Sequence, residues 1–227
     1  WARSVLGFEV VMRIGIHYGK KLVDVEVGEE NLVKTGRRNS STPLVDPVAA
    51  LRACLEAPLG FPPLRSAFTP DDHVAIVVDE EIPGLPALLS VLIEHVVSAN
   101  VAPSAITLVC PPTKSAQPWV EELPEALEEV RVEVHDPTDR RKLSYLASTK
   151  KGRRIYLNRT VVDADQAIVL SRRRFDPMLG YSGAETALYP TLSDEATLLE
   201  LQGQSSVEAP GDGTSAVRRE AVEVSWL

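Results

Sequence analysis

The sequence places ionisable side chains shortly after three apolar segments. Asp79 ends the segment HVAIVVD, Lys114 lies four residues beyond AITLVC, and Asp176 follows DQAIVLS after a short basic stretch. A carboxylate at such a position can act as a general base or hold a substrate hydroxyl, and a lysine can meet an anionic substrate. The alternatives are a carboxylate that caps the helix after Asp79 and a loop lysine that is only solvated.

The basic stretch belongs to the segment SRRRFDPMLGYSG, residues 171–183, which ends in a glycine turn. Arg172 and Arg174 can clamp a carboxylate through paired N–H groups, or they can lie in an exposed loop. The turn GYSG leads into helix-forming residues, an arrangement that holds a phosphate or presents a catalytic side chain in many enzymes. Its spacing differs from the G-x-S-x-G nucleophile turn, and no base is evident beside Ser182, so serine catalysis is not predicted.

Several other classes of site find no support in the sequence. The four histidines are not spaced as a metal pair, and the two cysteines form neither a metal nor a disulfide pattern, with Cys110 expected to be buried. Neither G-x-G-x-x-G nor G-x-x-x-x-G-K-[ST] occurs, so a dinucleotide site and a P-loop are not predicted. His135 can enter a cleft, but the turn HDPTD favours a structural role in which Asp136 and Asp139 bond backbone amides.

The composition indicates a soluble globular protein. The chain has 227 residues, a net charge of -8, 44% hydrophobic residues and a mean hydropathy of -0.04. The acidic balance argues against nucleic-acid binding, and no apolar run approaches the ~20 residues that span a bilayer. Without a signal-peptide pattern we expect a cytoplasmic protein. Basic residues concentrate in residues 140–174, as solvated loops or as a positive surface for a small anion.

We expect an α/β fold: a mainly parallel, Rossmann-like sheet with flanking helices and an N-terminal β-hairpin. The segments VVMRIGIH and KLVDVEV predict the hairpin, and DPVAALRACLEAPLG predicts a helix capped by Asp46. From Asp72 onward strands alternate with helices, which is typical of a parallel sheet. The predicted strands are HVAIVVD, AITLVC, VRVEVHD, RRIYLN and DQAIVLS, and the predicted helices are PALLSVLIEHVVSAN and SAQPWVEELPEALEEV, the second interrupted by proline.

In such sheets ligands bind outside the carboxyl ends of the strands. This rule selects three turns: DEEIPG at residues 79–84, CPPTKSAQP at residues 110–118, and SRRRFDPMLGYSG at residues 171–183. We expect all three to lie on one edge and to face one cleft. That cleft would gather the ionisable residues named above.

The domain prediction is one α/β domain over residues 1–202, with the hairpin at residues 10–27 and a core at residues 72–190. Residues 203–227 are predicted to form a mobile loop and the start of a truncated helix, AVRREAVEVSWL. This unfinished amphipathic pattern, together with a first residue other than Met, predicts a fragment. A missing C-terminal domain of the same chain would complete the cleft.

Most of the chain resembles the N-terminal domain of the lactate racemase family. The resemblance rests on IHYGKKLVDVEVGEENLV, VAIVVDEEIP, ITLVCPPTK, VHDPTDRRKLSYLASTKKGRRIYLNRTVVDADQAIVLS and LGYSGAETALYP. The long fourth segment, with its HDP turn, is the most specific. The resemblance implies a Rossmann-like fold and a racemase or epimerase of a small 2-hydroxy acid that uses a nickel-pincer nucleotide.

The chain departs from the family pattern where the family's chemistry is carried. Ile82 stands in place of a substrate-binding arginine, and Lys114 and Asp176 fall at or near the positions of two catalytic histidines. Thr186 replaces the lysine that carries the cofactor covalently, and Gln202 falls near a nickel-binding histidine. Threonine cannot form that linkage, and glutamine is a poor nickel ligand beside imidazole. We therefore expect no covalently bound cofactor and no protein metal ligand.

Two functions follow as expectations. The first is a divergent lactate-racemase-like isomerase, and the second is a catalytically inactive small-anion-binding or regulatory paralogue on the same fold. The expected partners are a small anionic substrate and the missing C-terminal domain, with no nucleic acid and no membrane. The candidate residues are Asp79, Lys114 and Asp176 for catalysis, Arg172 and Arg174 for the substrate, and Gly180, Ser182, Gly183 and Thr186 for the cofactor turn.

Overall fold

The structure is a computed structural model. It describes residues 11–18, 21–28, 31, 43–113, 117–149, 152–176, 180–204 and 216–227. The chain divides into two compact units, residues 1–45 and residues 46–227.

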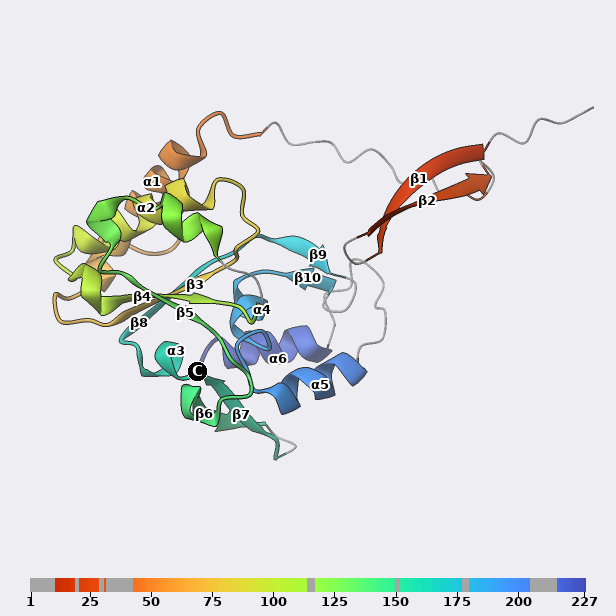
Figure 1. The fold of residues 1–227 in the computed structure, drawn as a ribbon. Helices are drawn as coiled ribbons and strands as arrows, with labels where there is room; N and C mark the ends of the chain where they lie inside the picture. The colour runs from red at the N-terminus through yellow and green to blue at the C-terminus, as the bar shows by residue number, and fades with distance from the viewer. Residues whose placement is uncertain are drawn as a thin grey trace, which may run out of the picture. The chain divides into compact units, whose positions relative to one another are not determined.

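The first unit contains the predicted hairpin, formed by β1 (Val11–Tyr18) and β2 (Lys21–Gly28) (Figure 1). The strands pair antiparallel over their whole length, and directly opposed residues share a face. One face therefore collects three apolar pairs: Met12 with Val27, Ile14 with Val25, and Ile16 with Val23. The hairpin prediction is confirmed.

The second unit is built on a four-stranded parallel sheet in the order β5-β4-β3-β8. The strands are β3 (Val74–Val78), β4 (Ile106–Cys110), β5 (Arg131–Val134) and β8 (Gln166–Leu170). Every residue of β3 and β4 is buried, which explains why their sequences are continuous apolar runs. The predicted α/β class is confirmed.

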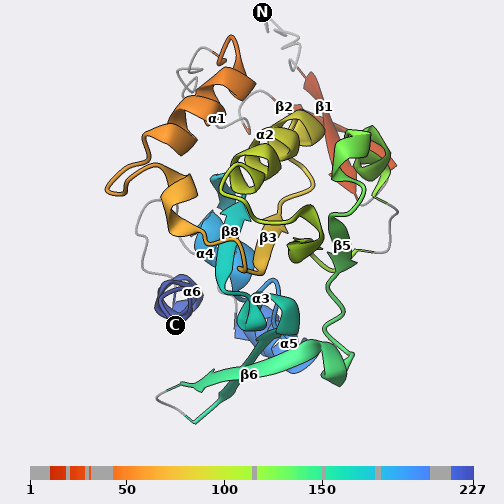
Figure 2. The ribbon, with the colours of Figure 1, turned by 90° about the vertical axis from the view of Figure 1, so that its left-hand side faces the viewer.

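Helices α1 (Pro47–Glu56) and α2 (Leu85–Val97) cover one face of this sheet (Figure 2). As predicted, Asp46 caps α1, because its side chain accepts a hydrogen bond from the amide of Ala49 at 2.9 Å. The apolar side of α2 packs on the sheet through Leu89 and Ile93, both fully buried.

The opposite face of the sheet is covered by shorter segments. Helix α3 (Arg159–Asp163) and helix α4 (Ala184–Leu188) both contribute partly buried residues there, and Leu192 is fully buried against β3 and β4. This thinner cover matters for function, because short elements leave parts of the face open.

The predicted strand RRIYLN is not part of the parallel sheet. It forms β7 (Arg154–Asn158), which pairs antiparallel with β6 (Leu143–Ser148) in a separate two-stranded sheet. The physical reason is the connection: residues 149–153 are too few for the crossover of a dozen or more residues that a parallel pair needs.

The predicted helix SAQPWVEELPEALEEV is also wrong for the described residues. Two short 3₁₀ turns occupy this region, Pro118–Glu122 and Glu125–Leu127. Between them, Leu123 is extended, with φ of -73° and ψ of 145°. Pro124 causes this break, because proline lacks an amide donor and disfavours helical backbone at the preceding residue.

The C-terminal part contains α5 (Glu195–Gln204) and α6 (Ala216–Val224). The predicted apolar face of α6, formed by Val217, Ala221 and Val224, is buried against residues of β7 and α5 and against Tyr189, which follows α4. Residues 205–215 of the predicted loop lie outside the described part of the chain. None of the helices in the described residues is long and apolar enough to cross a membrane.

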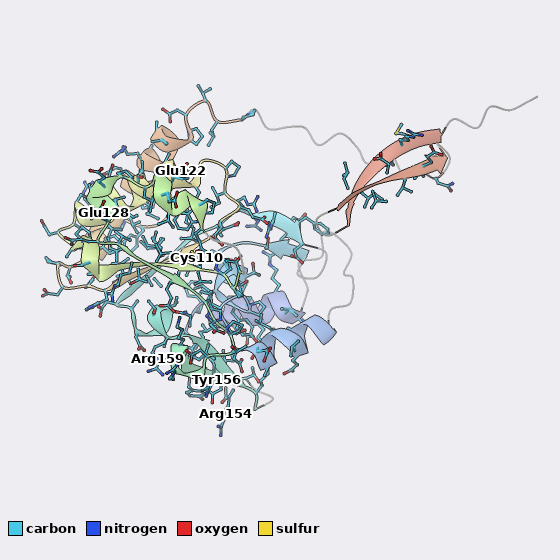
Figure 3. All side chains as sticks on the ribbon, in the orientation of Figure 1. Cys110, Glu122, Glu128, Arg154, Tyr156 and Arg159 are labelled. Carbon is cyan, nitrogen blue, oxygen red and sulfur yellow. The ribbon has the colours of Figure 1, made fainter. Side chains whose placement is uncertain are left out.

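The two cysteines differ in exposure, which gives a simple test of the core. Cys110, at the end of β4, is fully buried, and burial aided by the charge of Glu80 raises the pKa of its thiol to about 12 (Figure 3). Cys54 is exposed on α1.

We expect an aromatic disulfide reagent at pH 8 to titrate one thiol in the native chain and two in denaturant, because only a thiolate reacts. Cys54→Ala should abolish the native reaction; rapid modification of both thiols would contradict the placement of β4.

Candidate functional site

Asp79 and Arg172 form an ion pair at the carboxyl edge of the sheet. Strand β3 ends just before Asp79, and its amide donates to the carbonyl of Leu170, the last residue of β8, at 2.9 Å. Arg172 donates to Asp79 Oδ2 from its amide at 3.3 Å and from Nε at 3.2 Å. Two turns that are more than 90 residues apart in sequence therefore meet at one carboxylate.

Glu81 extends this pair into a four-residue ion network. Its amide donates to Asp79 Oδ1 at 3.1 Å, and its carboxylate accepts hydrogen bonds from Arg172 Nη2 and Arg174 Nη1. The suggestion that a carboxylate of this turn caps the next helix is wrong, because α2 begins at Leu85 behind Gly84, without a side-chain cap.

A small β-ribbon carries the residues that follow. β9 (Arg174–Asp176) pairs antiparallel with β10 (Gly180–Ser182), so Ser182 lies opposite Arg174 and Gly180 opposite Asp176. The Ser182 hydroxyl donates to the carbonyl of Arg174 at 3.3 Å. This ribbon was not predicted from the sequence, and it brings the arginine segment back to the glycine turn.

These elements enclose a cavity of about 170 Å³. Its charged and polar lining comes from Asp79, Ser171, Arg172, Arg174, Asp176, Ser182, Thr186 and Thr191. Pro111 adds a residue from the turn after β4. The expectation that three strand-end turns face one cleft is therefore confirmed for the described residues, whereas Lys114 lies outside them.

The electrostatics of the cavity keep Asp79 ionised. Burial raises the pKa of its carboxyl, but hydrogen bonds from Glu81 and Arg172, with the charge of Arg172, outweigh burial and hold the pKa below its usual value. Hydrogen bonds from Arg174 and Arg172 likewise lower the pKa of Glu81. Asp79 is thus a weak base in this state, and it serves first to hold Arg172.

This pairing predicts a pH effect on stability. The folded-state pKa of Asp79 lies below its unfolded value of about 3.9. Its contribution to the free energy of unfolding is therefore complete above the unfolded pKa and is lost as the pH falls through the folded pKa. We expect Asp79→Asn to flatten the loss of unfolding free energy below about pH 4. Urea unfolding between pH 7 and pH 3 measures it, with exposed Asp71→Asn as control. Parallel curves for the wild type and Asp79→Asn would contradict the pair.

Thr186 occupies the place at which the resemblance expects a cofactor-bearing lysine, and its surroundings do not fit that role. It is buried, and its hydroxyl is used within its own turn: Gly183 N–H donates to Thr186 Oγ1 at 2.8 Å, and Oγ1 donates to the carbonyl of Gly183 at 3.0 Å. Threonine lacks the amine through which a lysine would be linked to the cofactor. The residue present is therefore a turn-closing residue, and no covalent attachment fits here.

The histidines lie elsewhere. His135 is buried away from the cavity, and the HDPTD turn is structural as expected, because Asp136 accepts from Thr138 N at 2.9 Å and Asp139 from Arg141 N at 3.0 Å. Among the described residues, no three histidine, cysteine or acidic side chains form a group that could hold a metal ion. Ile82, at which the resemblance predicts an arginine in the family, packs against the α1–α2 core.

Sequence reasoning missed Glu81 as a site residue. Its position two residues after Asp79 was a sequence signal, but only the fold brings Glu81 to Arg172 and Arg174. Gly180 lies in β10 and Gly183 precedes α4, as the predicted glycine turn requires.

The family model for the lactate racemase N-terminal domain matches residues 18–209 of this sequence. The chain belongs to this family. The match includes the β-hairpin's second strand, the parallel sheet and the ribbon that carries the candidate site.

Solved structures agree with this assignment at the level of fold. The lactate racemase apoprotein from Thermoanaerobacterium thermosaccharolyticum matches 95% of this chain with a TM-score of 0.69 and 16% identity. A protein from Thermotoga maritima matches 79% with a TM-score of 0.53 and 12% identity. The matches cover 53% and 47% of those chains, about half their length. No curated protein matches the sequence significantly.

Proposed function

We propose that the cavity beside Asp79 binds a small 2-hydroxy acid or a related anion, and that the protein racemises or epimerises that acid without a lysine-tethered cofactor. Membership of the lactate racemase family supports the substrate class. The observation that carries the proposal is the convergence of two arginines, two aspartates and Ser182 on one 170 Å³ cavity at the carboxyl edge of the parallel sheet.

The arginines retain donors for a substrate carboxylate. Arg172 uses Nε and Nη2 in its ion pairs, and Arg174 uses Nη1. Among the described residues, Arg172 Nη1 and the other two nitrogens of Arg174 have no hydrogen-bond partner. Guanidinium groups bind carboxylates through such paired N–H donors. Arg172 and Arg174 thus supply the charge that the family pattern places at the position of Ile82.

The acidic groups divide into two roles. Asp79 is ionised and paired with Arg172, so its role is to fix that guanidinium. Asp176 lines the cavity from β9 and is assigned the proton transfer to and from the substrate hydroxyl, with Ser182 as an additional hydrogen-bond partner. Inversion also requires an acceptor for the hydride of the α-carbon, and a cofactor held without a covalent link would supply it. The acid–base role of Asp79 and the role of Lys114 remain predictions.

The second candidate function is a catalytically inactive anion-binding or regulatory paralogue. The buried Thr186, closed onto Gly183, favours this reading, because it removes the family's attachment point for its cofactor. In this case the cavity binds the same anion but returns it unchanged.

Binding and turnover separate the two functions. The chain is titrated with D- and L-lactate by NMR. Two control ligands are titrated in the same way: propionate, which lacks the hydroxyl, and lactamide, which lacks the negative charge. We expect lactate to bind more tightly than either control and to shift the amides of Arg172, Arg174 and Ser182. Chiral chromatography then measures inversion: inversion supports the isomerase, and binding without inversion supports the paralogue. If neither lactate nor larger 2-hydroxy acids bind selectively, both candidate functions are contradicted.

A further inference from the structure

The larger unit contains a second cavity, of about 600 Å³, within the usual size of ligand sites. It lies near the amino ends of the strands, where Val74 and Ala75 begin β3, whereas the Asp79 cavity is lined by the last residues of β3. The two cavities share no lining residue. The second cavity is therefore separate from the candidate site described above.

The floor of this cavity follows from the sheet register. Ala75 pairs with Ala167 on one side and with Thr107 on the other, and Thr107 pairs with Arg131. Paired residues point to the same face, so small side chains form a row across the sheet. Ala75 and Thr107, the small members of that row that line the cavity, do not fill the space beside α3, which leaves the face hollow.

Thr107 adds a polar group to this floor. It is 8% exposed and lies between aliphatic neighbours in a buried strand. Its hydroxyl has no hydrogen-bond partner among the described residues, although buried polar groups are normally paired. A hydroxyl that lines a cavity and lacks a partner is suited to bind a ligand oxygen.

The rim of the cavity is positive. Four cationic residues line it, Arg131, Arg141, Lys142 and Arg159, against two acidic ones, Glu133 and Asp163. Glu133 is already engaged, because its carboxylate accepts from Asn158 Nδ2 at 3.0 Å and from Thr160 Oγ1 at 2.6 Å.

Most of the rim cations are not neutralised by carboxylates. Arg131 donates to the carbonyl of Ser104 at 3.2 Å, and Arg159 to the carbonyl of Leu143 at 3.1 Å. Lys142 has no ion pair among the described residues. A carbonyl satisfies a donor but leaves the positive charge uncompensated, so three cations remain available to an anion.

We propose that this cavity is a second ligand site, which takes a small organic phosphate. The phosphate binds at the rim formed by Arg131, Lys142 and Arg159, because a dianion suits several unneutralised cations. An apolar body of the ligand lies on Ala75 and Ala164, and one of its oxygens meets the Thr107 hydroxyl. The basic concentration in residues 140–174 then serves a site distinct from the Asp79 cavity.

Phenyl phosphate tests this site, because it joins a phosphate to a small apolar ring. The full chain is titrated with phenyl phosphate by NMR, and phenol and inorganic phosphate are titrated separately. We expect phenyl phosphate to bind at least fivefold more tightly than either part and to shift the amides of Ala75, Thr107 and Val132. Equal affinity for inorganic phosphate, or shifts confined to Arg172 and Arg174, would overturn the proposal.

Charge variants locate the phosphate. Lys142→Gln and Arg131→Gln should each weaken phenyl phosphate binding about fivefold, and Arg219→Gln, which removes an exposed charge on α6 away from the cavity, should leave it unchanged. Both rim residues are exposed, so their replacement should not disturb folding, and circular dichroism checks this. Equal binding by all three variants would show that the rim does not hold the phosphate.

Discussion

Replacement of Asn158 by alanine is expected to lower the free energy of unfolding by about 3 kcal/mol. Asn158 is fully buried at the end of β7, and its side chain links three elements. Its Nδ2 donates to Glu133 Oε1 on β5 at 3.0 Å and lies 3.3 Å from His135 Nδ1. Its Oδ1 accepts from Val161 N at 3.2 Å and so caps α3.

His135 shows why the loss is large. Its Nε2 lies 2.9 Å from the carbonyl oxygen of Ser193, which only accepts, so Nε2 carries the proton and Nδ1 accepts from Asn158. Burial lowers the pKa of His135, despite opposing effects of Ser193, Glu133 and Asp136, so the ring is neutral near pH 7. Without Asn158, the buried Nδ1 loses its partner, Glu133 loses a donor and α3 loses its cap.

Urea unfolding of Asn158→Ala and of the wild type measures this difference. Glu128→Ala, an exposed change on the same unit, should alter the free energy of unfolding by less than about 0.5 kcal/mol. A loss below about 1 kcal/mol for Asn158→Ala would show that the network does not carry the stability assigned to it.

The second large effect is expected at Arg172. Arg172→Gln should weaken 2-hydroxy acid binding at least tenfold, about 1.4 kcal/mol or more. This residue fixes Asp79 through two hydrogen bonds, joins Glu81, and lines the cavity. Glutamine keeps a polar group but loses the charge and the planar set of donors that recognise a carboxylate.

Arg173 provides a matched control in the same segment. It is exposed and does not line the cavity, although it lies between Arg172 and Arg174 in the sequence. Arg173→Gln should therefore bind 2-hydroxy acids as the wild type does. If the two variants weaken binding equally, the effect is a general loss of positive charge, and the assignment of Arg172 to the substrate is wrong.

Much of the fold was predictable because burial dictates composition. β3 and β4 are covered on both faces and read as continuous β-branched runs, and the strand-end rule then placed Asp79 and Arg172 at one edge. Long-range pairing was not predictable in the same way. The β6–β7 pair depends on a short connection, and the β9–β10 ribbon places Ser182 opposite Arg174 by register alone.

The chemistry of the site needed the structure. The family resemblance predicts that Thr186 stands in place of a lysine, but only the reciprocal hydrogen bonds with Gly183 show that its hydroxyl is committed to the turn. Likewise the arginines were expected either to clamp a ligand or to lie exposed, and the structure shows a third state. They are paired with Asp79 and Glu81 and still line the cavity.

Intact mass spectrometry tests the central proposal most directly: this member of the lactate racemase family carries no covalently linked cofactor, because Thr186 stands where the resemblance predicts the lysine. The chain is produced in cells that also make the nickel-pincer nucleotide, beside a family member that keeps the lysine. We predict the mass of the unmodified 24.8 kDa chain, and an adduct only on the lysine-bearing protein. A nucleotide adduct on this chain, with nickel bound, would contradict the account.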